Sequence, residues 1–533
     1  MTVNKKIKNM ASVIFFLFVF FYEYKNIFCL ARFDYDYLND GKNYNFNLPE
    51  SYDSREKGLV TSIKTQGKSG PCWAFAIIST LESNYLKENN LCVKTDWEID
   101  FSEMNMIFNL NKGASLNNPY EFDFELSGNN EMASAYFASG RGPVFEQDDT
   151  YKPDYKTRDY EENLNKKSCK YIKKIIYVPD PDKNDEISLK NHRELVKKFI
   201  LENGSVATSI YFDENFLDDK EKNYFYGFDD KDCNHACSIV GWDDNYSRDN
   251  FNAQNKLPEK NGAFIIKNSW GQNGYIYISY KDTFAGHNCY LMQNIVDAQE
   301  KYKFENIYQH DYFGMTSAIE KKVLEGKKYI ASVFDLKAEK EALSEIGIFI
   351  ASNNTRAKVF LLKVNNSGEI IGRSNFLCEQ KFDFPGYYVI DLPEKILLED
   401  KKFGIGIEFL GCDFYIACET RENLFSSKAI GEKNKNFYGD QYGFQDFYGK
   451  QYDFTNFCIK AFTEKNVSLA KKVDYKSFSQ KYDITKKSID LLKPNIQNKP
   501  KKKYRFKYKL KFVLIMILLI IILIFALKII LKQ

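Results

Sequence analysis

The chain has 533 residues, of which 44% are hydrophobic, so it is long enough for two or three folded domains. Its 75 Lys and Arg nearly balance its 72 Asp and Glu, and a net charge of +3 over this length argues against a nucleic-acid partner. The 11 cysteines are odd in number and unevenly spread, which excludes a dense disulfide framework.

The first residues have the pattern of an export signal. Lys5, Lys6 and Lys8 precede an apolar run over 11–21, which is too short to span a bilayer. A cut after Ala31 would make 1–31 a signal peptide, and an uncleaved anchor is the alternative. Residues 32–47 are then expected to form a short leader.

A glycine-rich turn over residues 66–75 brings a cysteine to the start of a predicted helix. Pro71 precedes Cys72, and apolar residues follow at spacings of three and four, which predicts one buried helical face. The helix dipole at this position is expected to lower the pKa of the Cys72 thiol. A buried structural thiol is the alternative, because that is the usual fate of cysteine.

Two later stretches complete a chemical pattern. His235 lies at 233–242 in an Asn-His-Ala setting before an apolar run, and Asn268-Ser269-Trp270 lies within 264–271. With Gln66 and Cys72, these residues occur in the order found in papain-like cysteine peptidases, which the chain resembles over about residues 48–290. Ser69 and Pro71 depart from the family's nucleophile turn, and the loop after Trp270 is shorter than usual.

The resemblance implies a role for each of these residues. Cys72 would be the nucleophile, His235 the general acid and base, Asn268 the group that orients the imidazole, and Gln66 a donor to the oxyanion. Trp270 would shield the Asn–His bond beside the substrate. The reaction needs no cofactor and no metal, and Cys233 and Cys237 lack the partners of a zinc site.

A turn at Gly128 and Asn129 precedes a small-residue helix over 132–137. The resemblance makes both residues candidates for the substrate cleft, and a simple turn before a helix is the alternative. A further helix is predicted over 189–202, with strands over 205–210, 234–242, 263–267 and 274–280. Helices before strands suit an α+β, two-lobed papain-like fold, with the peptidase domain over 48–299.

The pattern changes after about residue 300. Short strand-like runs over 329–334, 346–350, 358–362, 386–390 and 403–409 predict an antiparallel β-sandwich over 300–465. This part resembles the lectin-like domain that follows some bacterial papain-like peptidases. Residues 466–510 are predicted to form a basic linker, and 511–531 are apolar enough for a transmembrane helix. The basic flank favours a cytoplasmic side, whereas the signal peptide favours export, which we weight more.

The leading hypothesis is therefore an exported, membrane-anchored cysteine endopeptidase at the cell surface, acting on protein or peptide substrates. A glycan or cell-wall ligand is a further expectation for the sandwich. One alternative is an adhesin whose peptidase lobe is inert. Another is a thiol transpeptidase or amidase that acts on cell-wall peptides.

Overall fold

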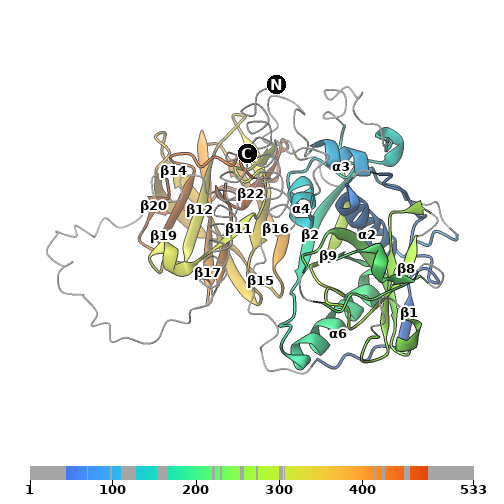
Figure 1. Ribbon diagram of the computed structural model, residues 1–533. Helices are drawn as coiled ribbons and strands as arrows, with labels where there is room; N and C mark the ends of the chain where they lie inside the picture. Colours follow the sequence, from blue (N-terminus) through green and yellow to red (C-terminus); the bar gives the residue numbers. More distant parts are fainter. Residues whose placement is uncertain are drawn as a thin grey trace, which may run out of the picture. The chain divides into compact units, whose positions relative to one another are not determined.

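A computed structural model describes residues 44–68, 70–95, 99–109, 128–152, 166–218, 222–228, 231–251, 257–271, 274–298, 304, 306–411, 414–421, 426–448 and 456–477 (Figure 1). The predicted signal peptide at 1–31 and the predicted transmembrane helix at 511–531 lie outside these ranges. Within them, no helix combines the length and the hydropathy needed to cross a membrane.

The first half of the chain supplies the helices. They are α2 (Cys72–Glu88), α3 (Glu103–Asn109), α4 (Asn130–Ala138) and α6 (Glu186–Asn203). Leu81 and Leu86 of α2 are completely buried, so α2 lies in the core of this half. The helix α6 begins where the Asp185 side chain accepts the Ile187 N–H and ends at Gly204, whose φ of 93° favours glycine.

Strands flank and follow these helices, and several of them contact α2. They are β1 (Ser51–Asp53), β2 (Lys170–Val178), β3 (Val206–Ile210), β4 (Leu217–Asp218), β5 (Asn223–Tyr224), β6 (His235–Asp243), β7 (Ala263–Lys267), β8 (Tyr275–Ser279) and β9 (Cys289–Asp297). All but β1 lie on one path, in the order β2-β9-β3-β6-β7-β8-β5-β4, and β1 pairs with β6. The predicted strands 205–210, 234–242, 263–267 and 274–280 are confirmed within a residue or two at each end.

The second half is a β-sandwich, as predicted. Its strands are β10 (Asn306–Tyr308), β11 (Ser317–Glu320), β12 (Tyr329–Asp335), β13 (Glu341–Ile350), β14 (Thr355–Val364), β15 (Ile370–Phe382), β16 (Gly386–Leu398), β17 (Lys402–Leu410), β18 (Tyr415–Glu419), β19 (Asn436–Asp440), β20 (Gly443–Asp446), β21 (Asn456–Phe457), β22 (Ile459–Glu464) and β23 (Tyr475–Ser477). A sheet in the order β20-β19-β12-β17-β14-β15-β23 faces the group β10-β22-β13-β16 across an apolar core.

The two halves share one sheet, which the sequence does not predict. Strand β16 pairs with β2, with Gly386 opposite Ile176 and Tyr388 opposite Lys174, so the described strands form a continuous 13-stranded sheet (Figure 1). A Cβ at Gly386 would lie 1.9 Å from the carbonyl oxygen of Ile175, so only glycine fits this junction.

Part of the predicted linker at 466–510 is folded. Strand β23 pairs with β15, and the Lys471 N–H donates to the Lys395 carbonyl at 2.8 Å. Residues 466–477 therefore belong to the sandwich, and the rest of the predicted linker lies outside the described residues.

Candidate active site

Cys72 is the first residue of α2, directly after Pro71. It is a free thiol with 4% of its surface exposed. Burial raises the pKa of Cys72, and the backbone N–H groups of Ala236, Trp73 and Cys72 itself offset this in part. The predicted lowering of the thiol pKa is therefore wrong, because desolvation exceeds the effect of the helix N-terminus. The contact with Ala236 brings the sulfur beside the residue that follows His235.

His235 is the first residue of β6, where pairing with Ile210 of β3 fixes its backbone. Its Nε2–H donates to Oδ1 of Asn268 at 2.8 Å. The ring of Trp270 stacks on the imidazole with the centroids 4.7 Å apart, and Phe212 packs edge-on against Trp270 at 4.5 Å. Burial lowers the pKa of His235 to about 4, against the opposing effect of the bond to Asn268. The resting imidazole is therefore neutral, with Nδ1 as its remaining nitrogen.

Asn268 directly follows β7 and is 3% exposed. Its backbone N–H donates to the Gly274 carbonyl at 2.6 Å, which closes the short loop that the sequence indicates. Its Oδ1 also accepts the Ser269 N–H at 2.8 Å. These bonds hold the amide in one orientation, so that its oxygen faces the imidazole of His235.

Gln66 is held from three sides. Its backbone N–H donates to the Ser269 carbonyl at 2.9 Å, and its carbonyl accepts the Tyr151 hydroxyl at 2.8 Å. The Ser269 hydroxyl donates to Oε1 at 2.5 Å, which leaves Nε2 as the donor end of the amide. The sequence does not predict that Ser269 and Tyr151 support Gln66. The position of Ser269 between Asn268 and Trp270 is a signal that could have indicated its role.

The turn at Gly128 and Asn129 lies beside Trp73, the residue that follows Cys72. A Cβ at Gly128 would come within 2.3 Å of the Trp73 indole, so packing requires glycine there. The Asn129 side chain accepts the Met132 N–H at 2.9 Å and caps α4. The capping bond supports the interpretation of Asn129 as part of a turn before a helix, and the role of both residues in substrate binding stays a prediction.

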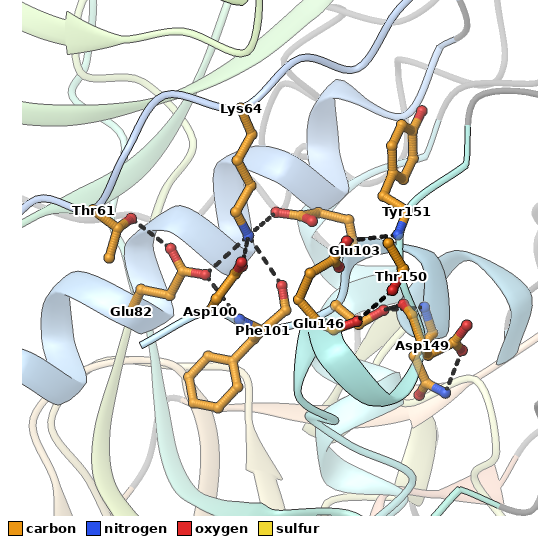
Figure 2. Close-up of polar contacts among 12 residues, drawn as sticks. Thr61, Lys64, Glu82, Asp100, Phe101, Glu103, Glu146, Asp149, Thr150 and Tyr151 are labelled. Atoms are coloured by element: carbon orange, nitrogen blue, oxygen red, sulfur yellow. Dashed lines mark hydrogen bonds and ion pairs between the residues drawn. The ribbon is translucent and has the colours of Figure 1, made fainter. Parts of the chain in front are cut away.

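A buried ionic network lies behind this site, and Figure 2 shows the Lys64 side chain reaching into a group of carboxylates. Lys64 Nζ lies 2.6 Å from Asp100, 2.9 Å from Glu103 and 3.1 Å from Glu82. Burial opposes the charge on Lys64, but the three carboxylates outweigh it and hold the pKa of Lys64 well above its ordinary value. Burial raises the pKa of Glu103 to about 8, against the attraction of Lys64.

The same network joins the elements that carry the site. Thr61 donates to Glu82 of α2 at 2.6 Å and accepts from Lys267 of β7 at 3.0 Å. Thr61 therefore connects the segment before Gln66 to two elements: α2, which begins at Cys72, and β7, which ends just before Asn268. The sequence offered no signal for this network, because its members are scattered along the chain.

Comparisons with known proteins agree with this geometry. Residues 48–298 match the family described as papain family cysteine protease, and residues 307–463 match the lectin like domain. Falcipain-2b of Plasmodium falciparum is 29% identical over 272 residues, covering 50% of this chain and 49% of that protein. Ananain of Ananas comosus is 26% identical over 238 residues, covering 44% of this chain and 56% of that protein. The chain thus spans about half the length of the curated relatives it matches.

A solved structure extends the likeness to both domains. The clostridial cysteine protease Cwp84 after propeptide cleavage has a TM-score of 0.67 and 25% identity, covering 78% of this chain and 99% of that chain. A structure of the cysteine protease and lectin-like domains of Cwp84, a surface layer associated protein of Clostridium difficile, covers 80% of this chain and 91% of that chain at 24% identity and a TM-score of 0.67. The chain therefore carries a papain-family peptidase domain followed by a lectin-like domain.

Proposed function

We propose that this papain-family chain is a cysteine endopeptidase in which Cys72 attacks the carbonyl carbon of a peptide bond. One observation carries the proposal: His235 is bonded to Asn268 and stacked by Trp270, while the backbone beside His235 contacts the Cys72 thiol. This set supplies a nucleophile, a proton carrier and a group that orients the carrier. The thiol is also free, as the chemistry requires.

The first step would transfer the Cys72 proton to Nδ1 of His235. Burial favours the neutral pair, so the thiolate and the imidazolium would form together, each stabilised by the other. The Nε2–H bond to Asn268 would hold the ring in plane during the transfer. Sulfur then bonds to the carbonyl carbon, and His235 returns the proton to the leaving amine, giving an acyl-enzyme and the first product. Water, deprotonated by His235, would release the second product.

The oxyanion would be stabilised by Nε2–H of Gln66 and by the backbone N–H of Cys72 at the start of α2. The bond from Ser269 to Oε1 supports this role, since it turns the donor end of the amide away from Ser269. One such donor lowers the activation barrier by about 3 kcal/mol. Gly128, Asn129 and Trp270 are proposed to line the cleft beside this centre.

Export, membrane anchoring and a glycan ligand belong to the same proposal. The signal-like pattern at 1–31 and the apolar run at 511–531 support a membrane-anchored position at the cell surface. The match of residues 307–463 to the lectin like domain supports a saccharide partner for the sandwich.

Peptide turnover by the full-length protein tests the proposed chemistry. Wild type should cleave members of a peptide library and react once with a thiol-directed epoxide, and Cys72→Ala should do neither. Cys378→Ala is the matched control, because Cys378 is also a free thiol but lies half-buried on β15. This variant should leave cleavage unchanged. No cleavage by wild type would favour the binding-protein alternative, and products with a new amide bond would favour a transpeptidase.

A further inference from the structure

A cavity of about 510 Å³ opens where the peptidase half meets the sandwich. Its walls come from β2, α6 and β9 on one side and from the β15–β16 hairpin on the other. Cavities of this size accommodate small-molecule ligands. It shares no lining residue with the proposed catalytic centre, so it needs an explanation of its own.

The floor of the cavity is a row of cross-strand neighbours. Lys174 of β2 lies opposite Tyr388 of β16 and opposite Gln293 of β9, so the three side chains share one face of the sheet. At one end of the cavity, Phe199 of α6 meets Phe384 of the hairpin edge-on, with centroids 5.3 Å apart. The pairing of β16 with β2 therefore fixes the position of the hairpin wall relative to the wall from the peptidase half.

The charges around the cavity are paired, with one exception. Lys198 pairs with Glu202 at 2.8 Å, and Lys381 pairs with Asp383 at 2.6 Å. A third cation, Lys173, bonds to Glu345 and Asp391, at 2.8 and 2.5 Å.

The exception is Lys174. Across the described residues, its ammonium group forms no hydrogen bond and no ion pair, and its Nζ lies 5.8 Å from the centroid of the Tyr388 ring. Burial lowers the pKa of Lys174, against the attraction of Asp383, which fits a cation that lacks a partner.

We propose that this cavity binds a carboxylate-bearing saccharide whose acid group pairs with Lys174. The proposal deepens the saccharide role proposed for the sandwich, rests on it, and is independent of peptide cleavage. A single carboxylate would supply the counter-ion that Lys174 lacks. The amides of Gln293, Asn294 and Gln380 line the same cavity and suit sugar hydroxyls, since an amide can both donate and accept.

The strand pairing favours a saccharide over an acidic peptide. Peptides that bind along a sheet need an unpaired strand edge. At Lys174, β2 is already paired on both sides, with β9 and with β16. Recognition must then come from side chains, which combine the polar groups of the floor with apolar lining residues such as Ile176 and Phe199. That mixture of polar and apolar groups matches the hydroxyls and the C–H face of a sugar ring.

Binding of glucuronic acid and of glucose, its uncharged match, to the full-length protein tests the proposal by saturation-transfer NMR. Glucuronic acid should bind at least about tenfold more tightly than glucose, as expected for a bond to a charged group. Lys174→Met should remove that preference. The matched control is Lys363→Met. Lys363 lies on β14, away from the cavity, and pairs with Asp400, so this variant should keep the preference for glucuronic acid. The melting temperature of Lys174→Met should not fall below that of wild type, since Lys174 has no ion pair to lose.

Each other result overturns a defined part of the proposal. Equal binding of both sugars overturns the role of the charge, and binding unaffected by Lys174→Met overturns the location. Tight binding of an acetylated glutamate dipeptide in place of the sugar overturns the ligand class. If glucose binds as tightly as glucuronic acid, the saccharide role of the sandwich is supported but the carboxylate site at Lys174 is refuted. If neither sugar binds, both the saccharide role and the site are refuted. Peptide cleavage, measured alongside, reports separately on the catalytic proposal.

Discussion

Lys64→Met removes the one ammonium that lies among three carboxylates. Glu82 and Glu103 have side chains 0% and 1% exposed, whereas the Lys64 side chain is 23% exposed. Removing one partner of a buried pair leaves an uncompensated charge and costs about 3 to 5 kcal/mol. The partial exposure of Lys64 places the expected loss near the lower end, about 3 kcal/mol. For a domain of about 250 residues, this corresponds to roughly a 10 °C fall in melting temperature.

Calorimetry at pH 8 and at pH 5 measures this loss, with Cys72→Ala in every sample to prevent self-digestion. The pKa of Glu103 is raised, so its protonated form favours the folded state below the unfolded pKa, and that stability is lost as pH rises through about 8. Without Lys64 the folded pKa of Glu103 rises further. The deficit of Lys64→Met should therefore be larger at pH 8 than at pH 5.

Lys198→Met is the matched control, because Lys198 and its partner Glu202 are 32% and 49% exposed and the pair should contribute less than about 1 kcal/mol. The reasoning is refuted if Lys64→Met costs no more than this control. It is also refuted if its deficit is the same at both pH values, since the buried carboxylates would then not be the cause.

Three further predictions concern the site and the domain junction. Gln66→Ala should lower kcat by about 100-fold or more with little change in KM, measured by steady-state peptide cleavage, because it removes one oxyanion donor; an unchanged kcat would exclude that role. Trp270→Ala should admit water and raise the pKa of His235 from about 4 toward its ordinary 6.5, as followed by NMR titration of the imidazole, and an unmoved value would contradict shielding by the indole. Gly386→Ala should lower stability by more than about 2 kcal/mol in calorimetry, because its Cβ would collide with the Ile175 carbonyl 1.9 Å away, and a neutral effect would contradict the pairing of β16 with β2.

Local signals explain what the sequence could predict. The helix after Cys72 has apolar residues at spacings of three and four, and the strands that begin at His235 and end before Asn268 are short, mainly apolar segments. Their chemistry could be inferred because three short motifs occur in one order. In the described residues His235 bonds to Asn268, Gln66 bonds to Ser269, and the Cys72 thiol contacts the Ala236 backbone; the catalytic roles stay predictions.

Pairing between distant segments explains what the sequence could not predict. Strand β2 is rich in lysine, with Lys170, Lys173 and Lys174 among its residues, which is typical of a polar surface segment. It is nevertheless central, because Lys173 and Lys170 are neutralised by acids far along the chain, at Glu345 and Asp297. No local pattern specifies such partners, so the shared sheet and the cavity beside it emerge only from the fold.

The helix α2, which begins at Cys72, shows the same effect at the candidate site. Apolar spacing predicts one buried face, yet Thr80, Glu82 and Asn84 are also buried, with 0%, 0% and 2% of their surface exposed. Their polar atoms are satisfied by tertiary bonds: Ser238 of β6 donates to the Ala76 carbonyl at 2.9 Å and lies 2.8 Å from the Thr80 hydroxyl. Ser238 lies three residues after His235 on the same strand. These hydrogen bonds between the polar side of α2 and β6 therefore fix the position of the helix that carries Cys72 relative to the strand that carries His235. Apolar contacts, which have no preferred direction, would fix it less precisely.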